Sequence, residues 1–135
     1  SIKNLNDKPI NLVLNQLKKG KKNKVHNINF IGAQATFLAG AYPSLKRLHT
    51  LMKKNKSLKI VIEGHTNGCD GGVESSQILS QNRAKAVESY LTENGIAAER
   101  ISTKGYNCKY MLYPNTTKEE EMSLNRRVEI LVTDL

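Results

Sequence analysis

The stretch GHTNGCDGG, residues 64–72, is the part of the chain that least resembles ordinary scaffold sequence. It places a His, an Asn, an Asp and a Cys among four glycines, directly after the apolar run 58–62. The oxygens of Asn67 and Asp70 can accept hydrogen bonds from an ammonium group. A helix expected after the stretch exposes unpaired N–H groups and a partial positive charge at its start, and Arg83 adds a bidentate fork. Together these groups predict a clamp for the carboxylate and amine of an amino-acid end.

Other chemistry is less well supported by the residues. An arginine that is partly exposed on a helix is more often a surface ion-pair partner, and this alternative for Arg83 stays open. His65 has no His or Cys at ligand spacing, so a scaffold role is favoured over a metal or acid/base role. The sequence has no GxSxG, HExxH or P-loop pattern, and no His matched to a Cys or Ser. We therefore expect a protein that is not an enzyme and that uses no cofactor and no metal.

Cys69 and Cys108 are the two cysteines of the chain, and they lie too far apart in sequence for a CxxC metal pair. Both lie in polar sequence beside Gly, Asn or Asp. From the residues alone, a disulfide and two free thiols are equally supported.

The net charge of +9, from 21 Lys and Arg against 12 Asp and Glu, favours anionic partners such as nucleic acid, anionic lipid or carboxylate-rich polymers. The lysines concentrate at 18–24 and 53–59, where solvated turns beside strands and a helix end explain them. The five Tyr and two Phe are not interleaved with basic residues, so we expect no nucleic-acid partner. No apolar run approaches the roughly 20 residues of a membrane helix, so we expect no direct membrane span.

The elements that must position the clamp follow from the periodicity of apolar residues. Strands are expected at 10–14, 25–30, 58–64, 100–106 and 126–135. Amphipathic helices are expected at 41–55 and 76–94, and residues 107–125 are expected to form a long loop. Gly95 suits the left-handed position that ends a helix, and Ile96 can fold back onto it. The order β-α-β-α-β-β predicts a two-layer α/β (α+β) sandwich in which helices pack on one face of a mixed sheet.

Three segments, KIVIEGHTNG, LSQNRAKAVESYLTENGIAAERISTKGYN and NRRVEIL, resemble the C-terminal domain of outer-membrane protein A, a peptidoglycan-binding module. The resemblance runs from Val25 to the end of the chain. It implies non-covalent binding of the diaminopimelate residue of the peptidoglycan stem peptide, through an Asp after GHT and the Arg of LSxxRA. The Arg carries over as Arg83, whereas Asn67 stands in the place of the Asp. Asn67 can accept a hydrogen bond but supplies no charge, and Asp70 is the candidate for restoring that charge.

Further positions match the family's pocket. The resemblance assigns ligand-site positions to Thr66, Ser76, Leu79, Ala84, Arg126 and Arg127. One of the last two arginines is expected to reach the pocket and the other to face solvent, and the sequence does not say which. The resemblance also implies an oxidising periplasm, which favours a Cys69–Cys108 disulfide that pins the pocket loop.

On this resemblance, we expect residues 1–24 to be a run-in or linker from a preceding domain and residues 25–135 to be the OmpA-like domain. The expected function is to anchor an outer-membrane protein, lipoprotein or envelope complex, including a secretion complex, to the cell wall from the periplasm of a Gram-negative cell. The main alternative is a degenerate module that acts as a protein-interaction domain without binding cell wall. An altered ligand, for example an amidated one, a basic nucleic-acid binder and a wall-degrading enzyme are further alternatives.

Overall fold

The structure is a computed structural model that describes residues 19, 20 and 22–135, with only the backbone of residues 22–27. The strand expected at 10–14 and most of the expected run-in lie outside the described residues. The described elements follow in the order β1 (Lys22–Asn29), α1 (Tyr42–Lys54), β2 (Lys59–Gly64), α2 (Val73–Glu93), β3 (Ile101–Gly105), α3 (Glu119–Asn125) and β4 (Arg127–Asp134). Short 3₁₀ turns, η3 (Ala39–Ala41) and η4 (Ala98–Arg100), precede α1 and β3.

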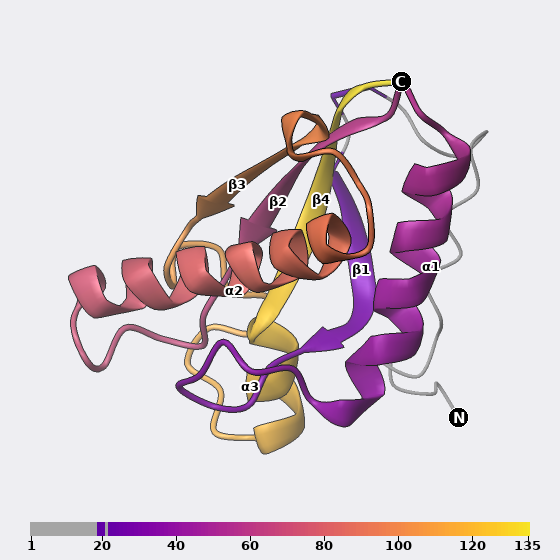
Figure 1. The fold of residues 1–135 in the computed structure, drawn as a ribbon. Helices are drawn as coiled ribbons and strands as arrows, with labels where there is room; N and C mark the ends of the chain where they lie inside the picture. Colours follow the sequence, from indigo (N-terminus) through magenta and orange to yellow (C-terminus); the bar gives the residue numbers. More distant parts are fainter. Residues whose placement is uncertain (1–18, 21) are drawn as a thin grey trace.

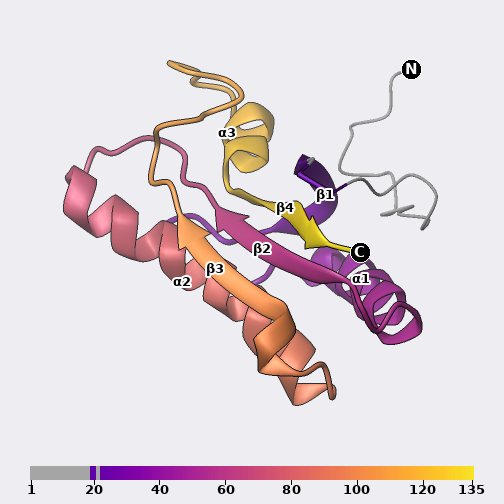
Figure 2. The same cartoon turned by 90° about the horizontal axis from the view of Figure 1, so that it is seen from above.

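The described strands form one mixed sheet in the order β1-β4-β2-β3 (Figure 1). β4 runs antiparallel to β1 and β2, whereas β2 and β3 run parallel. Figure 2 shows α1 and α2 on the same face of this sheet, with α2 crossing β2 and β3 and α1 beside β1. The expected two-layer α/β arrangement is confirmed.

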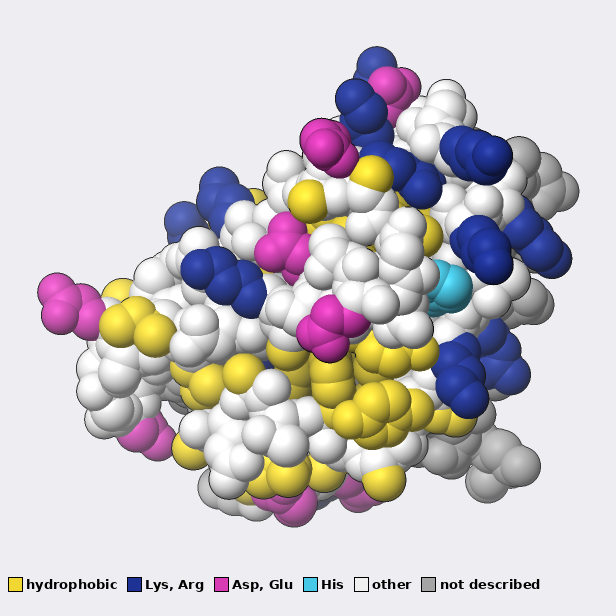
Figure 3. Space-filling view, viewed as in Figure 1, with side chains coloured by type: hydrophobic (Ala, Val, Ile, Leu, Met, Phe, Trp, Pro, Cys, Tyr) yellow, Lys and Arg dark blue, Asp and Glu magenta, His cyan; other side chains and the backbone are white. Residues whose placement is uncertain are grey.

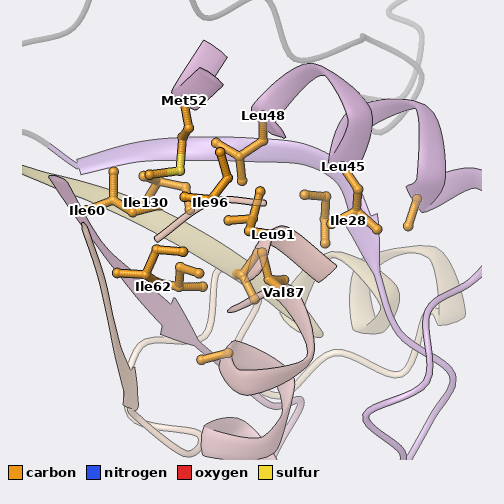
Figure 4. Packing of buried hydrophobic residues seen from close by; sticks show 14 of the residues in the cluster. Ile28, Leu45, Leu48, Met52, Ile60, Ile62, Val87, Leu91, Ile96 and Ile130 are labelled. Atoms are coloured by element: carbon orange, nitrogen blue, oxygen red, sulfur yellow. The ribbon is translucent and has the colours of Figure 1, made fainter. Parts of the chain in front are cut away.

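The core lies between the sheet and the two long helices, because alternate strand residues point to that face. Figure 4 shows side chains from the strands meeting those of both helices. Those it labels, all at most 5% exposed, are Ile28, Leu45, Leu48, Met52, Ile60, Ile62, Val87, Leu91, Ile96 and Ile130. α2 begins near the edge of the sheet where β2 and β3 end (Figure 1).

Two glycines set how closely α2 approaches the sheet. A Cβ added at Gly64, the last residue of β2, would overlap the carbonyl oxygen of Ser80 in α2. A Cβ at Gly105, the last residue of β3, would overlap the backbone nitrogen of Gln81. The helix backbone therefore packs directly on both strand ends, and the loops that follow β2 and β3 lie beside the first turns of α2.

The helix boundaries agree with the expectation at one end and differ at the other. α2 ends at Glu93, followed by Gly95 at φ 93°, and the Ile96 N–H donates to the Leu91 carbonyl (3.0 Å), as the sequence predicts. It begins at Val73, earlier than the expected residue 76.

The expectation of one loop over 107–125 is wrong for its last part, which forms α3. Glu119, Glu120 and Glu121 occupy the first turn of α3, where the helix dipole favours negative charge. Such a short, polar helix has no apolar stripe from which periodicity could have predicted it.

Basic side chains gather over α1, at the right of Figure 3. The helix carries four exposed cations, Lys46, Arg47, Lys53 and Lys54, and no acidic residue. These four side chains are exposed to solvent, and none of them lines the pocket described below.

Candidate functional site

A pocket of about 350 Å³ opens where β2 ends. Its walls come from the loop after β1, the loop between β2 and α2, the first three turns of α2, and one arginine that precedes β4. The lining residues are Ala33, Thr66, Asn67, Gly68, Asp70, Gly71, Ser75, Ser76, Leu79, Arg83 and Arg126. The structure therefore brings together most of the side chains that the sequence assigns to a ligand site.

Arg83 lines this pocket although the residue is only 1% exposed. Its Nε donates to the carbonyl of Gln34 (3.0 Å), its Nη1 to that of His65 (3.0 Å) and its Nη2 to that of Ile31 (3.3 Å). Because a guanidinium has five N–H donors, one N–H on each terminal nitrogen has no partner among the described residues. Free N–H groups on both terminal nitrogens can donate to the two oxygens of a carboxylate.

The positive charge of Arg83 has no counter-ion within the part of the chain that the structure describes. Burial, with a smaller contribution from nearby Arg126, lowers the pKa of Arg83 from its usual value to about 10, so the group stays charged at neutral pH. A charge held away from water without a counter-ion is unfavourable, and an anion in the pocket would offset that cost. The alternative of a surface ion-pair role for Arg83 is therefore wrong.

Asn67 lines the pocket from the loop between β2 and α2, and hydrogen bonds fix the orientation of its side-chain amide. Its Oδ1 accepts a hydrogen bond from Nδ2 of Asn125 (2.7 Å). Asn125, which is 0% exposed, is itself held by the backbone of Tyr113: its Oδ1 accepts from the N–H (2.9 Å) and its Nδ2 donates to the carbonyl (3.0 Å). Reversing the Asn125 amide would set donor against donor and acceptor against acceptor, so the oxygen of Asn67 must face it.

The loop that carries Asn67 is fastened to the loop after β3. The expected disulfide is present, with the Cα atoms of Cys69 and Cys108 5.7 Å apart. The Thr66 N–H donates to the carbonyl of Asn107 (3.0 Å), and the Asn107 N–H donates to Oγ of Ser80 in α2 (2.9 Å). Two loops and a helix are thus held together on one side of the pocket, which reduces the freedom that the glycine-rich segment would lose on binding.

The sequence did not decide which of the adjacent arginines reaches the pocket; in the structure Arg126 lies between α3 and β4, and Arg127 is the first residue of β4. Arg126 lines the pocket and donates through Nη1 to Oε1 of Glu119 (2.7 Å), whose side chain is 72% exposed. Arg127 does not line the pocket, and it does not face solvent as expected: it is 6% exposed and its Nε donates to Oε2 of Glu129 (2.8 Å). Arg126 caps the end of α3, whereas Arg127 lies in β4 on the same strand face as Glu129, so the two side chains have different surroundings.

Ala84 is the other predicted site residue that the lining does not include, because it is 0% exposed within the core. The sequence did not single out Ala33, which reaches the pocket from the loop after β1 with φ 59°. It also did not single out Asn125, whose contact with Asn67 joins positions 58 residues apart. No local pattern signals either residue.

His65 belongs to the scaffold of the site. Its residue is 2% exposed, its carbonyl accepts from Arg83, and its ring stacks on Tyr106 with centroids 5.7 Å apart. Among the described residues, no cluster of His, Cys, Asp and Glu side chains could hold a metal ion. Within the same residues, every helix is too short or too polar to cross a membrane.

Comparison with known proteins places this fold and pocket in a family. A model of the OmpA family matches residues 29–126. Probable lipoprotein YiaD of Escherichia coli strain K12 is 31% identical over 113 residues, which are 84% of this chain and 51% of that protein. Peptidoglycan-binding protein ArfA of Mycobacterium tuberculosis strain H37Rv is 34% identical over 99 residues, which are 73% of this chain and 29% of that protein. The C-terminal domain of Helicobacter pylori MotB superposes with a TM-score of 0.65 at 25% identity, covering 78% of this chain and 81% of that chain.

Fold and pocket together define a small α/β domain with a ligand-sized pocket, and members of the matching family are non-catalytic, as expected. The chain belongs to the OmpA family. It spans about half or less of the length of the curated relatives that it matches.

Proposed function

We propose that this chain binds peptidoglycan non-covalently, by holding a carboxylate of the diaminopimelate-containing stem peptide at Arg83. The observation that carries the proposal is that Arg83 is buried beside a pocket, keeps one N–H free on each terminal nitrogen, and has no acidic partner among the described residues. A bound carboxylate would complete the hydrogen bonding of the guanidinium and neutralise its charge.

The groups around Arg83 also favour a negatively charged ligand. Gly71, Ser75 and Ser76 bring the N-terminal end of α2 to the pocket, where its partial positive charge favours an anion. Arg126 adds a second guanidinium, partly neutralised by Glu119. The pocket therefore has an excess of positive charge, which suits the carboxylate-rich stem peptides of peptidoglycan.

Anchoring follows from binding if the chain is attached to another envelope component. ArfA carries the name of a peptidoglycan-binding protein, and other relatives are an outer-membrane protein and a probable lipoprotein. On this basis the proposed role is to tether an outer-membrane protein, a lipoprotein or a larger envelope complex, such as a secretion complex, to the cell wall from the periplasm.

Binding can be tested by co-sedimentation with purified sacculi and by calorimetric titration with soluble stem peptides. Arg83→Lys keeps the charge but removes the fork, so we expect affinity to fall at least about tenfold, the equivalent of one charge-assisted hydrogen bond. The matched control is Arg100→Lys, because Arg100 also donates to three backbone carbonyls but lies outside the pocket. Wild-type protein that shows no saturable binding to sacculi would contradict the proposal.

The alternative is a protein-interaction module without wall binding. It is favoured by Asn67, because position 67 of the pocket then has no carboxylate to bind an ammonium group. It predicts that neither sacculi nor stem peptides bind at millimolar concentration. The same titration therefore decides between the two functions.

A further inference from the structure

The groups that line the pocket discriminate between kinds of carboxylate. Resting on the proposed function, we propose that the pocket selects a carboxylate whose neighbouring nitrogen is acylated, as at the C-terminus of a peptide, over the zwitterionic end of an amino acid. The selection comes from Asn67, which presents hydrogen-bond donors to the ligand where an ammonium group would need an acceptor.

The first step is the direction of the Asn67 amide. Because Tyr113 fixes the orientation of Asn125 at two points, Nδ2 of Asn125 must face Oδ1 of Asn67. Nδ2 of Asn67 then has no partner among the described residues, and Asn67 lines the pocket. An amide nitrogen donates two hydrogen bonds and accepts none, so this side of the pocket calls for a carbonyl or carboxylate oxygen.

The second step is the balance of charge. Two guanidinium groups, of Arg83 and Arg126, line the pocket against one carboxylate, that of Asp70. Asp70 is exposed, so its charge is screened by water and offers an ammonium group little stabilisation. Arg83, by contrast, is 1% exposed and interacts with a ligand at low dielectric. An ammonium group placed beside the bound carboxylate would be repelled by the buried charge and not compensated by Asp70.

A peptide C-terminus supplies what these groups lack. Its carboxylate provides two acceptors for the free N–H groups of Arg83, and the carbonyl before its last residue provides an acceptor for the Asn67 amide. Its last nitrogen is part of a peptide bond and carries no charge. In a stem peptide the terminal carboxylate has this chemistry, whereas the free end of the diaminopimelate side chain carries an ammonium group.

The test uses one stem tetrapeptide in three forms, titrated by calorimetry into the wild-type chain. The first form is unmodified, the second has the diaminopimelate side-chain amine acetylated, and the third has its C-terminal carboxylate amidated. We expect the acetylated form to bind at least as tightly as the unmodified one, and the amidated form to bind at least about tenfold more weakly.

Asn67→Asp should reverse this order, because a carboxylate at position 67 would still accept from Asn125 while offering an acceptor and a charge to an ammonium group. The acetylated form should then bind more weakly than the amidated form. The matched control is Asn115→Asp, the same chemical change at an exposed residue of positive φ outside the pocket lining, and it should leave the order unchanged.

The results separate failure of this inference from failure of the proposed function. If amidation has no effect, or acetylation abolishes binding, the zwitterionic end is the group recognised, and the inference is overturned while the proposed function stands. If wild-type protein binds neither the unmodified peptide nor sacculi, the proposed function fails and the inference fails with it.

Discussion

Arg83 and Arg100 lie toward opposite ends of the sheet and are held in closely similar ways, yet only Arg83 lines the pocket at the end of β2. Arg100 donates through Nε to the carbonyl of Leu58 (3.0 Å) and through Nη2 to those of Met52 (2.8 Å) and Asn55 (2.6 Å). Each arginine thus satisfies three backbone carbonyls, and neither has an acidic partner among the described residues. The number of hydrogen bonds alone therefore does not distinguish a structural arginine from a binding one.

The difference lies in where the carbonyls come from. Those bound by Arg100 belong to the last turn of α1 and the short turn between α1 and β2, so the guanidinium closes one continuous segment and remains partly exposed. Those bound by Arg83 belong to two separate loops, which leave a cavity between them, and its free donors are divided between its terminal nitrogens. The two loops that Arg83 joins therefore leave a pocket beside its buried guanidinium, whereas the continuous segment that Arg100 joins does not take part in that pocket.

The largest expected effect on stability comes from a substitution at Gly64, where β2 ends beside the pocket. In Gly64→Ala the new Cβ overlaps the backbone of Ser80, so we expect a loss of about 4 kcal/mol or more in the free energy of unfolding, or no soluble protein. Urea denaturation measures this. Gly40→Ala is the control, because no atom lies within 4 Å of its added Cβ, and a change of similar size there would contradict the interpretation.

Removing the disulfide should loosen the pocket end while leaving the turn at Arg100 intact. For the double variant Cys69→Ser, Cys108→Ser we expect a loss of about 2–4 kcal/mol in the free energy of unfolding, since the bond closes a loop of 39 residues. Urea denaturation with and without reductant is the measurement: wild-type stability should fall in reductant, and the variant should not respond. An unchanged wild-type midpoint in reductant would show that the bond adds no stability.

The smallest effect should come from the rim of the pocket. The hydrogen bond from Arg126 lowers the pKa of the exposed Glu119, so the pair is intact at neutral pH and partly neutralises Arg126. Glu119→Gln should therefore tighten carboxylate binding by a factor of about two to three, within the range of an exposed ion pair. Titration with the unmodified stem peptide measures the change, and Glu120→Gln controls for the loss of one negative charge in α3. Unchanged or weaker binding would contradict the interpretation that Glu119 offsets the charge that Arg126 presents to the ligand.

Much of the fold could be predicted because it depends on local signals. The apolar run 58–62 and the Gly95–Ile96 helix end each report their structure within a few residues, and both are found as expected. α3 could not be predicted, since its seven residues show charge at the start but no apolar face.

The residues of the candidate site also differ in whether local sequence signals could predict them. Asn67 and Arg83 were predicted together because the end of a strand and the next helix meet at one edge of a sheet. The assignment of Arg127 could not be made, because the two adjacent arginines differ only in lying at the end of α3 and at the start of β4, and α3 itself was not predicted. The direction of the Asn67 amide depends on Asn125 and Tyr113, far along the chain, and it is set by tertiary contacts alone.

Among the described residues Arg83 has no acidic partner, and this also couples folding to occupancy by the proposed ligand. The unfolded chain hydrates this guanidinium fully, whereas the folded domain withdraws it from water and leaves it for an external anion to neutralise. By mass action, a ligand at one hundred times its dissociation constant adds about 2.7 kcal/mol to the stability of the folded state. The empty domain is therefore the more easily unfolded form, and a domain held by its ligand is also the one better protected against proteolysis.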